Sequence, residues 1–264
     1  MEMHNVLQKQ PDCEPKLSDG RKFSAVHGIQ ERPEPTPLFA CFLKDALWKK
    51  QPIRVCVLSG PSRMRKKVMK YANKWRKAGL KFKFVKKGDK ADIRITIDAS
   101  EGSSSWSYIG SQARTIENSK PTMNLAIDEG MSEVYIRQTI LHEMGHAIGL
   151  VHEHSSPASS IKFKPCQVYG YYKKSLNWSK ETVDENVLKK YNSAECSTSS
   201  VHDSESIMHY EVPASCTEDG YSTPQNTDLS SLDRKTVAKA YPKDEHDRNK
   251  AKIASTSKCV LDRK

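Results

Sequence analysis

Four histidines and two glutamates fall within the thirteen residues HEMGHAIGLVHEH, positions 142–154. His142 and His146 are four residues apart, so on a helix their imidazole rings leave the same face, one turn apart. Two such rings can bind one zinc ion. Glu143 is poorly placed as a third ligand but well placed to take a proton from a water that the zinc binds. The spacing therefore predicts a hydrolytic zinc site with Glu143 as general base.

The third ligand is predicted from a glycine three residues after His146. Gly149 can end the helix in a left-handed turn, which glycine adopts without steric conflict. The chain can then bend back, so that His152 reaches the same ion. Three histidines leave the fourth zinc position open, which is typical of catalytic rather than structural zinc sites. For His154 a surface position, a hydrogen-bonding role and a substrate contact are all open, and we expect the surface.

The alternative to a zinc site is a chance arrangement of histidines. The short pattern H-E-x-x-H fixes three positions and recurs by chance in unrelated proteins. The longer pattern H-E-x-x-H-x-x-G-x-x-H fixes five positions, and it lies on a segment that independently reads as a helix followed by a turn. A structural zinc site is disfavoured because no cysteine lies close enough in the sequence to close the fourth position.

The segments around the motif alternate between strand and helix patterns. Strands are expected at 52–58, 81–85, 92–98 and 122–127, with a further edge strand within 106–114, and helices at 62–79, 133–149, 182–191 and 229–242. Ser132 is the expected N-cap of the motif helix, and Thr182 with Glu185 forms the expected capping box of the next helix. The order strand, helix, strand, strand predicts an α/β beginning with a right-handed crossover.

The basic residues are concentrated in one segment. The net charge is +11, and residues 61–90 carry thirteen Lys or Arg and one acid, so the remainder sums to about zero. Such a segment could attract nucleic acid, an anionic membrane or acidic proteins. We expect a solvated helix face beside a strand with outward lysines. No specific nucleic-acid partner is expected, because few aromatic residues alternate with the lysines.

Length and cysteine content set further limits. The 264 residues suffice for one large domain or two small ones, and no run of eighteen apolar residues predicts a transmembrane helix. Seven cysteines cannot all pair within one chain, although one or two bridges could form, for example among Cys166, Cys196 and Cys216. No signal peptide is recognisable, and the acceptor sequon at Asn177 is weak support for export, so the compartment stays open.

The motif resembles the zinc signature of the metzincin endopeptidases, and among them most closely that of the astacin family. Metzincins pair this signature with a turn built on a methionine, here SIMHY at 206–210, in which Met208 would form a hydrophobic floor under the histidines. Tyr210 matches the tyrosine that reaches the zinc site in astacin-like enzymes. The resemblance implies that Tyr210 is a fifth ligand at rest or a donor to the oxyanion; the alternative is an ordinary buried aromatic residue.

The resemblance covers about residues 46–242 and implies the metzincin fold, of the α+β class. It implies an α/β-like N-terminal subdomain (46–149) with a twisted, mostly parallel sheet and one antiparallel edge strand, the active-site helix, and a smaller irregular C-terminal subdomain (150–242). Residues 1–45 would be an extension, disordered or pro-segment-like, and 243–264 a charged tail. Extended protein substrates pair antiparallel with the edge strand in this family, and 106–114 are the candidates here.

The implied function is that of a zinc-dependent metalloendopeptidase, which we expect to be a monomer. Two other classes are considered: a catalytically silent zinc-binding module acting through the basic 61–90 surface, and a nucleic-acid binder with a bystander zinc. The chain departs from the astacin pattern after the third histidine. Glu153 is present and would bind the new N-terminus of a mature enzyme, but Ser156 stands where an arginine is usual and no cut site is evident.

Overall fold

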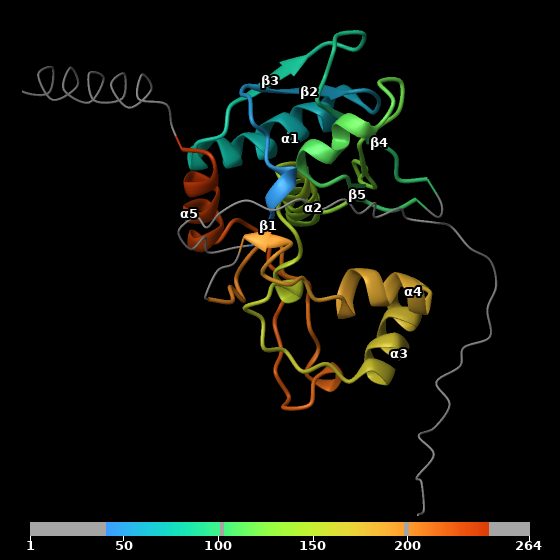
Figure 1. The fold of residues 1–264 in the computed structure, drawn as a ribbon. Coiled ribbons are helices and arrows are strands. Elements are labelled where there is room, and N and C mark those ends of the chain that lie inside the picture. The colour runs from blue at the N-terminus through green and yellow to red at the C-terminus, as the bar shows by residue number, and fades with distance from the viewer. Residues whose placement is uncertain (1–40, 101–102, 198–200, 243–264) are drawn as a thin grey trace, which may run out of the picture.

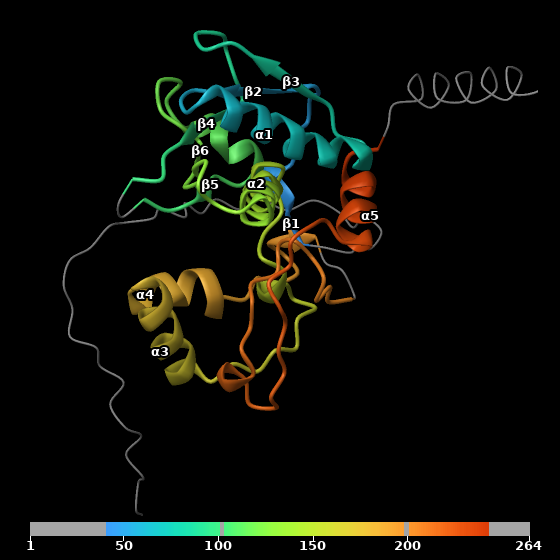
Figure 2. The same ribbon diagram turned by 180° about the vertical axis from the view of Figure 1, so that it is seen from behind.

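The computed structural model describes residues 41–100, 103–197 and 201–242, so the extension and the tail expected at the two ends lie mostly outside the described residues. Figures 1 and 2 show two parts, an upper one with a sheet and helices α1 and α2, and a lower one of short helices and long loops. None of the helices in the described ranges is long and apolar enough to cross a lipid bilayer.

The upper part is built on a five-stranded sheet with the order β3-β2-β4-β6-β5. Its strands are β2 (Ile53–Val57), β3 (Phe82–Val85), β4 (Ile93–Ile97), β5 (Trp106–Ser107) and β6 (Met123–Leu125). Neighbouring strands run parallel, except that β5 pairs antiparallel with β6. In β4, three isoleucines alternate with polar residues and point into the main core. The predicted mostly parallel sheet with one antiparallel edge strand is confirmed.

Helix α1 (Ser62–Ala72) connects β2 to β3 and packs along one apolar face. Met64, Val68 and Tyr71 recur at helical spacing and are buried, while the basic residues between them point outward. A 3₁₀ turn continues the helix to Ala78. Gly79 then ends it in the left-handed conformation, with φ of +103°, as the sequence predicted.

Helix α2 (Glu133–Ala147) carries the first two histidines of the motif. The Ser132 side chain accepts a hydrogen bond from the backbone N–H of Tyr135 at 3.2 Å, so the predicted N-cap is confirmed. Most of its side chains from Ile136 onward are buried, because α2 lies between α1, the sheet and the lower part of the molecule. A helix buried on nearly all sides is held more firmly than one with a solvated face.

The lower part contains α3 (Pro165–Leu176), α4 (Lys180–Val183) and a π-helical turn (Asp184–Leu188), and α5 (Ser231–Ala240) returns to the end of α1. A short ladder of β1 (Phe42–Leu43) and β7 (Cys196–Ser197) ties the beginning of the described chain to this part. A Cys41–Cys196 disulfide reinforces the ladder. Phe42 is fully buried in the main core, so the packed chain begins before the boundary expected at residue 46.

Two expectations for the helices of the lower part were wrong. The helix expected from Thr182 begins earlier, because the Ser179 side chain accepts the N–H of Thr182 at 3.2 Å and is itself the N-cap. Glu185 pairs with Lys189 instead of closing a capping box, and the helical region ends at residue 188. Helix α3 was not predicted, although Pro165 at its first turn is a common helix-start signal.

The edge strand and the cysteine pairing also differ from expectation. Only Trp106 and Ser107 of the segment 106–114 form strand β5, and residues Gly110–Thr115 form a 3₁₀ turn. The chain turns at Gly110, which adopts φ of +49° and packs against the backbone of Ala46. A Cβ atom added to Gly110 would lie 1.9 Å from the carbonyl oxygen of Ala46, so only glycine fits there. Cys196 pairs with Cys41, and Cys216 is a free, buried thiol, so none of the bridges suggested among Cys166, Cys196 and Cys216 forms.

The contact between Gly145 and Met208 joins α2 to the lower part. Met208 is fully buried, and a Cβ atom on Gly145 would lie 2.3 Å from its sulfur. The methionine therefore packs directly on the helix backbone. Packing of this kind leaves no room for one additional methyl group.

We expect Gly145→Ala to lower the free energy of unfolding by about 1–3 kcal/mol, because the new methyl group must displace Met208 from a filled core. The control is Gly170→Ala in α3, where no atom lies within 4 Å of the added Cβ. Since alanine favours the helix, that variant should be about 0.5–1 kcal/mol more stable than the wild type. Chemical denaturation measures both; effects of the same sign would contradict the packing described.

Candidate active site

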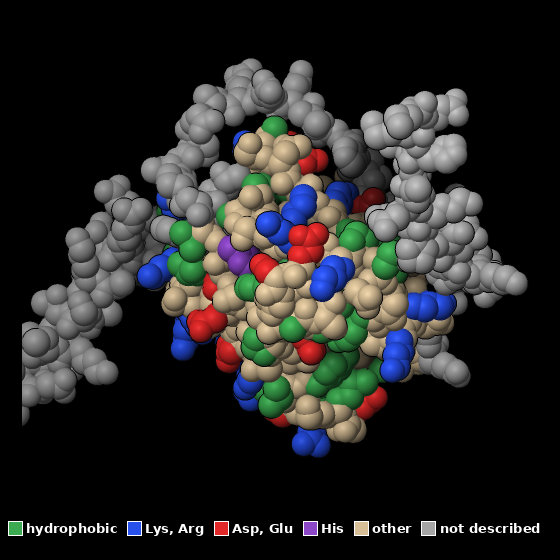
Figure 3. Space-filling model, turned by 90° about the horizontal axis from the view of Figure 1, so that it is seen from below, with side chains coloured by type: hydrophobic (Ala, Val, Ile, Leu, Met, Phe, Trp, Pro, Cys, Tyr) green, Lys and Arg blue, Asp and Glu red, His purple; other side chains and the backbone are tan. Residues whose placement is uncertain are grey.

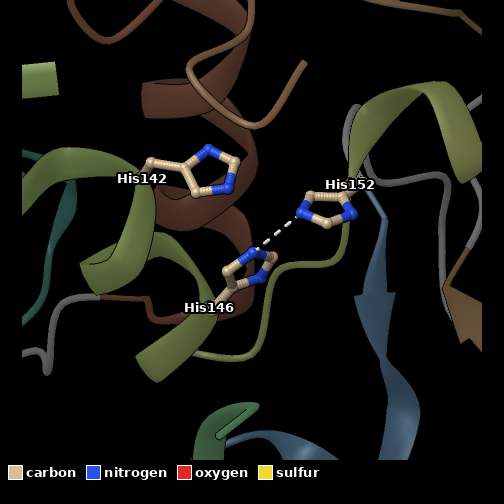
Figure 4. A group of neighbouring side chains, drawn as sticks. All are labelled: His142, His146 and His152. Atoms are coloured by element: carbon tan, nitrogen blue, oxygen red, sulfur yellow. Dashed lines mark hydrogen bonds between the residues drawn. The ribbon is translucent and has the colours of Figure 1, made fainter. Parts of the chain in front are cut away.

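The structure brings His142, His146 and His152 together (Figure 4). One ring nitrogen of each lies within 4.8 Å of the other two, and the Nε2 atoms of His146 and His152 are 3.1 Å apart. The first two rings come from one face of α2, one turn apart, and the third comes from the chain that follows the helix. The predicted grouping of these three residues is confirmed.

Backbone carbonyls orient two of the rings. His142 donates from Nδ1 to the carbonyl of Ile207 at 2.8 Å, and His146 donates from Nδ1 to the carbonyl of Leu150 at 2.9 Å. A proton on Nδ1 leaves the lone pair on Nε2, the atom that turns toward the centre of the group. Metal-binding histidines commonly have this second hydrogen bond, which fixes tautomer and orientation.

Burial keeps the three imidazoles neutral. It lowers the pKa of His142 and of His152, and it lowers the pKa of His146 to about 3, with a smaller contribution from the neighbouring rings. A histidine binds zinc as the neutral imidazole, and three such rings with one open position match a catalytic zinc site. The residues present therefore fit a zinc ion.

Gly149 makes the turn that places His152. Its φ is +107°, and the turn is closed by hydrogen bonds from the N–H of Gly149 to the carbonyl of His146 (2.8 Å) and from Leu150 to Gly145 (3.0 Å). These bonds satisfy carbonyls that the end of a helix would otherwise leave unpaired. The left-handed turn predicted from the sequence is confirmed.

Two aromatic side chains anchor the end of α2. The indole N–H of Trp48 donates to the carbonyl of Ala147 at 2.8 Å, and the hydroxyl of Tyr241 donates to the carbonyl of Ile148 at 2.7 Å. Both bonds are buried and join residues 99 and 93 positions apart. Trp48 lies near the beginning of the described chain and Tyr241 near its end. Both fix the last turn of α2, which carries His146. Neither residue was singled out from the sequence.

Asp233 fixes the turn that contains Met208. Its carboxylate accepts hydrogen bonds from the hydroxyl of Ser206 (2.7 Å), the N–H of Ile207 (2.9 Å) and the N–H of Ser230 (2.9 Å), and the side chain is fully buried. The carbonyl of Ile207 is the group that orients His142. Asp233 thus connects α5 to a zinc ligand through a single residue, Ile207. The Ser230–Asp233 capping box was the signal in the sequence that could have drawn attention to it.

Glu143 and Tyr210 lie beside the three histidines. Glu143 is 6 % exposed, and its Oε2 atom has no hydrogen-bond partner among the described residues. Burial raises the pKa of this carboxyl to about 8. The ring of Tyr210 lies 4.2 Å from that of His152 and 5.6 Å from that of His142, measured between centroids. Burial, and then the charge of Glu143, raise the pKa of Tyr210 well above its ordinary value.

The surface position expected for His154 is wrong. Its ring is fully buried and stacks on that of His152 with centroids 5.2 Å apart, and its Nε2 donates to the carbonyl of Asn186 at 3.0 Å. Its pKa falls to about 3 because it is buried and lies near His209. This histidine supports the third ligand from behind instead of meeting solvent.

Glu153 is also fully buried and ties the motif to the methionine turn. Its N–H donates to the carbonyl of Met208 at 3.0 Å, and its Oε1 accepts from the N–H of Asp203 at 3.0 Å. Its Oε2 has no partner within the described part of the chain. Ser156, which stands in place of the usual arginine, is buried as well and accepts the N–H of Ala158 at 3.2 Å.

Comparisons with known proteins agree with this geometry. A sequence profile of the astacin family of peptidases matches residues 42–242. A structure of myroilysin is 33 % identical, with a TM-score of 0.73, and the alignment covers 78 % of this chain and 100 % of that one. A crystal structure of myroilysin is 34 % identical, with a TM-score of 0.54 and coverage of 76 % and 87 %.

A more distant match shares the fold. High choriolytic enzyme 1, a hatching-enzyme zinc protease from the medaka fish Oryzias latipes, is 16 % identical, with a TM-score of 0.52 over 78 % of this chain and 99 % of that one. No curated protein matches the chain.

The profile spans most of the chain, and the described structure supplies the three neutral histidines that its zinc chemistry requires. The chain therefore belongs to the astacin family of zinc metalloendopeptidases, and His142, His146 and His152 form its zinc site.

Proposed function

We propose that the chain cleaves internal peptide bonds of proteins with Glu143 as general base and Tyr210 as donor to the oxyanion. The observation that carries this proposal is the buried Glu143 carboxylate, which lies beside three neutral histidines and has one oxygen without a hydrogen-bond partner among the described residues. When bound, the zinc ion supplies Lewis acidity, which polarises the scissile carbonyl and makes a water molecule more acidic. The remaining steps belong to side chains of this protein.

Glu143 takes the proton of the attacking water and passes it to the nitrogen of the leaving amine. A general base works best when its pKa lies near the working pH, and burial moves Glu143 in that direction. A nearby cation moves the pKa back down, so the carboxylate is ionised when the reaction begins. Because Glu143 follows His142 directly on α2, the helix that holds the ligands also holds the base.

Tyr210 donates a hydrogen bond to the oxygen on which negative charge develops. Its raised pKa keeps the hydroxyl protonated, as a donor must be. The Tyr210 ring packs against the rings of His142 and His152. The ring of Trp178 also lies close, with its centroid 6.4 Å from that of Tyr210. This packing limits the positions that the hydroxyl can take.

The substrate lies in extended form along β5. This strand is the last of the sheet and, among the described strands, pairs only with β6, so its outer edge can accept a further antiparallel strand. The edge includes Trp106 and Ser107 and continues to Tyr108, whose N–H still bonds to the carbonyl of Thr122. The 3₁₀ turn that follows limits the pairing to this short stretch instead of the full segment 106–114.

We also propose that the catalytic domain comprises residues 41–242 and divides near Gly149 into an N-terminal and a C-terminal subdomain. Burial of Phe42 in the main core and the profile match from residue 42 support the earlier start. The separate small core around Val168 and Val183 supports the division.

Glu143→Gln is expected to retain zinc and to lower kcat/KM by about 10²–10⁴-fold, because the amide cannot accept the proton of the water. Peptide hydrolysis and metal analysis of the purified variant check this. Glu133→Gln at the first turn of the same helix is the matched control and should retain near-normal activity. A fully active Glu143→Gln enzyme would refute the assigned base.

Tyr210→Phe is expected to lower kcat by about 10²–10³-fold with little change in KM, because the lost hydrogen bond forms only as charge develops on the oxygen. Steady-state kinetics on one peptide substrate separate the two constants. Tyr135→Phe at an exposed position of α2 is the control. A rise in KM alone would assign Tyr210 to substrate binding instead.

Casein cleavage by the purified, zinc-loaded protein should stop when a zinc chelator is added and return when zinc is restored, because all three ligands serve one ion. The readout is the release of soluble peptides. Cleavage that persists in chelator would contradict a zinc-dependent peptidase. The absence of cleavage in a fully metal-loaded sample would favour a silent zinc-binding module.

A further inference from the structure

The concentration of positive charge in residues 61–90 is not used by the site. We define the basic end of the molecule by Arg63 and Lys66 of α1 together with four exposed lysines at β3 and the turn after it. These four are Lys83, Lys86, Lys87 and Lys90. Figures 1 and 2 both place α1 directly beneath β2 and β3, so the two elements that carry these residues lie side by side at one end of the upper part.

The residues of the basic end carry uncompensated charge. Among the described residues no ion pair involves any of the six. Acids that approach the segment contact other lysines: Glu133 pairs with Lys67 and Lys70, and Asp228 pairs with Lys74. The acid within the segment, Asp89, accepts the backbone N–H of Lys86 at 3.1 Å. The positive field of this end is therefore open to solvent.

Edge protection and solubility explain only part of this charge. One or two lysines on the edge strand β3 would suffice to block pairing with another chain. Edge protection gives no reason for Arg63 and Lys66, which lie one turn apart on a helix and repel each other. Ordinary surfaces intersperse both signs, as the opposite side of the molecule does in Figure 3, where blue and red side chains alternate.

The position of the basic end separates it from the scissile peptide. β3 is the first strand in the sheet order and β5 the last, so three strands lie between the basic end and the proposed substrate strand. A partner bound at the basic end would leave the zinc site accessible. The basic end is therefore suited to bind a ligand that anchors the enzyme. It is not placed to bind the peptide that is cut.

The chemistry of this end selects among anionic partners. Tyr71, Trp75 and Phe82 are buried. The fourth aromatic residue of the segment, Phe84, is partly buried against the main core, so no fully exposed ring is available to stack on nucleotide bases. Met69, at 40 % exposure, is the one large apolar side chain of α1 that is exposed, which is little for insertion into a membrane. Clustered lysines without aromatics suit a chain of sulfate or carboxylate groups.

We propose that the basic end binds an acidic polysaccharide, sulfated or carboxylated, and thereby anchors the peptidase on it. The flexible lysines after β3 contact successive anionic groups as point charges, and Arg63 and Lys66 extend the contact onto α1. Binding releases counterions and therefore weakens steeply as salt rises.

The test uses the full, zinc-loaded chain with fluorescent heparin as the probe, titrated at several NaCl concentrations. The variant Lys83→Gln/Lys86→Gln/Lys87→Gln should lose at least tenfold in affinity, and its slope of log affinity against log salt should fall by about 2–3. Adding Arg63→Gln and Lys66→Gln to this triple variant should weaken heparin binding further. The matched control, Lys162→Gln/Lys164→Gln/Lys174→Gln, removes three exposed lysines of the lower part and should change affinity less than twofold.

Two further probes in the same titration test the choice of partner. Hydrolysis of a short peptide shows whether each variant is folded. Duplex DNA of matched length and vesicles with 30 % phosphatidylserine should bind more weakly than heparin, and peptide hydrolysis should be unchanged in all variants. Equal losses in the basic-end variant and the lower-part control would overturn the proposal, because net charge alone would then explain binding. Tighter binding of DNA or of vesicles would overturn the choice of a polysaccharide.

Discussion

Hydrogen bonds from imidazole Nδ1 atoms to backbone carbonyls are the interactions on which the rest of the structure depends. The carbonyl that orients His146 is local, four residues away at Leu150, and is supplied by the turn at Gly149. The carbonyl that orients His142 belongs to Ile207, sixty-five residues away. One ligand can therefore be set by the helix end alone, whereas another requires that the lower part be docked correctly against α2.

Docking of the lower part is accordingly reinforced at several points. Met208 packs on the bare backbone of Gly145, and Asp233 holds the peptide of Ile207 from the side of α5. The β1–β7 ladder and the Cys41–Cys196 disulfide join the start of the described chain to the segment before the methionine turn. Each of these contacts joins residues distant in sequence, so the zinc site forms only when the two parts have folded together.

This dependence explains which features could be predicted from the sequence. The zinc ligands and the turn at Gly149 follow from spacing along one helix and its end, and both were predicted correctly. The burial of His154 could not be predicted, because Asn186 and Tyr210, which surround it, come from distant segments. The same holds for β5, which Gly110 shortens through its contact with Ala46. Local patterns report local geometry, and tertiary contacts decide the rest.

Desolvation affects both the metal-binding histidines and the two side chains proposed to act in catalysis. Removing water disfavours charge, so it keeps the imidazoles of His142, His146 and His152 neutral, which is the state that binds a metal ion. The same removal of water strengthens the hold of Glu143 on a proton and keeps the Tyr210 hydroxyl protonated. The zinc ligands and the proposed base and donor thus owe their protonation states to one cause, the burial of these residues together. Burial is in turn secured by the docking of the lower part, which links the chemistry of the site to the packing of the whole fold.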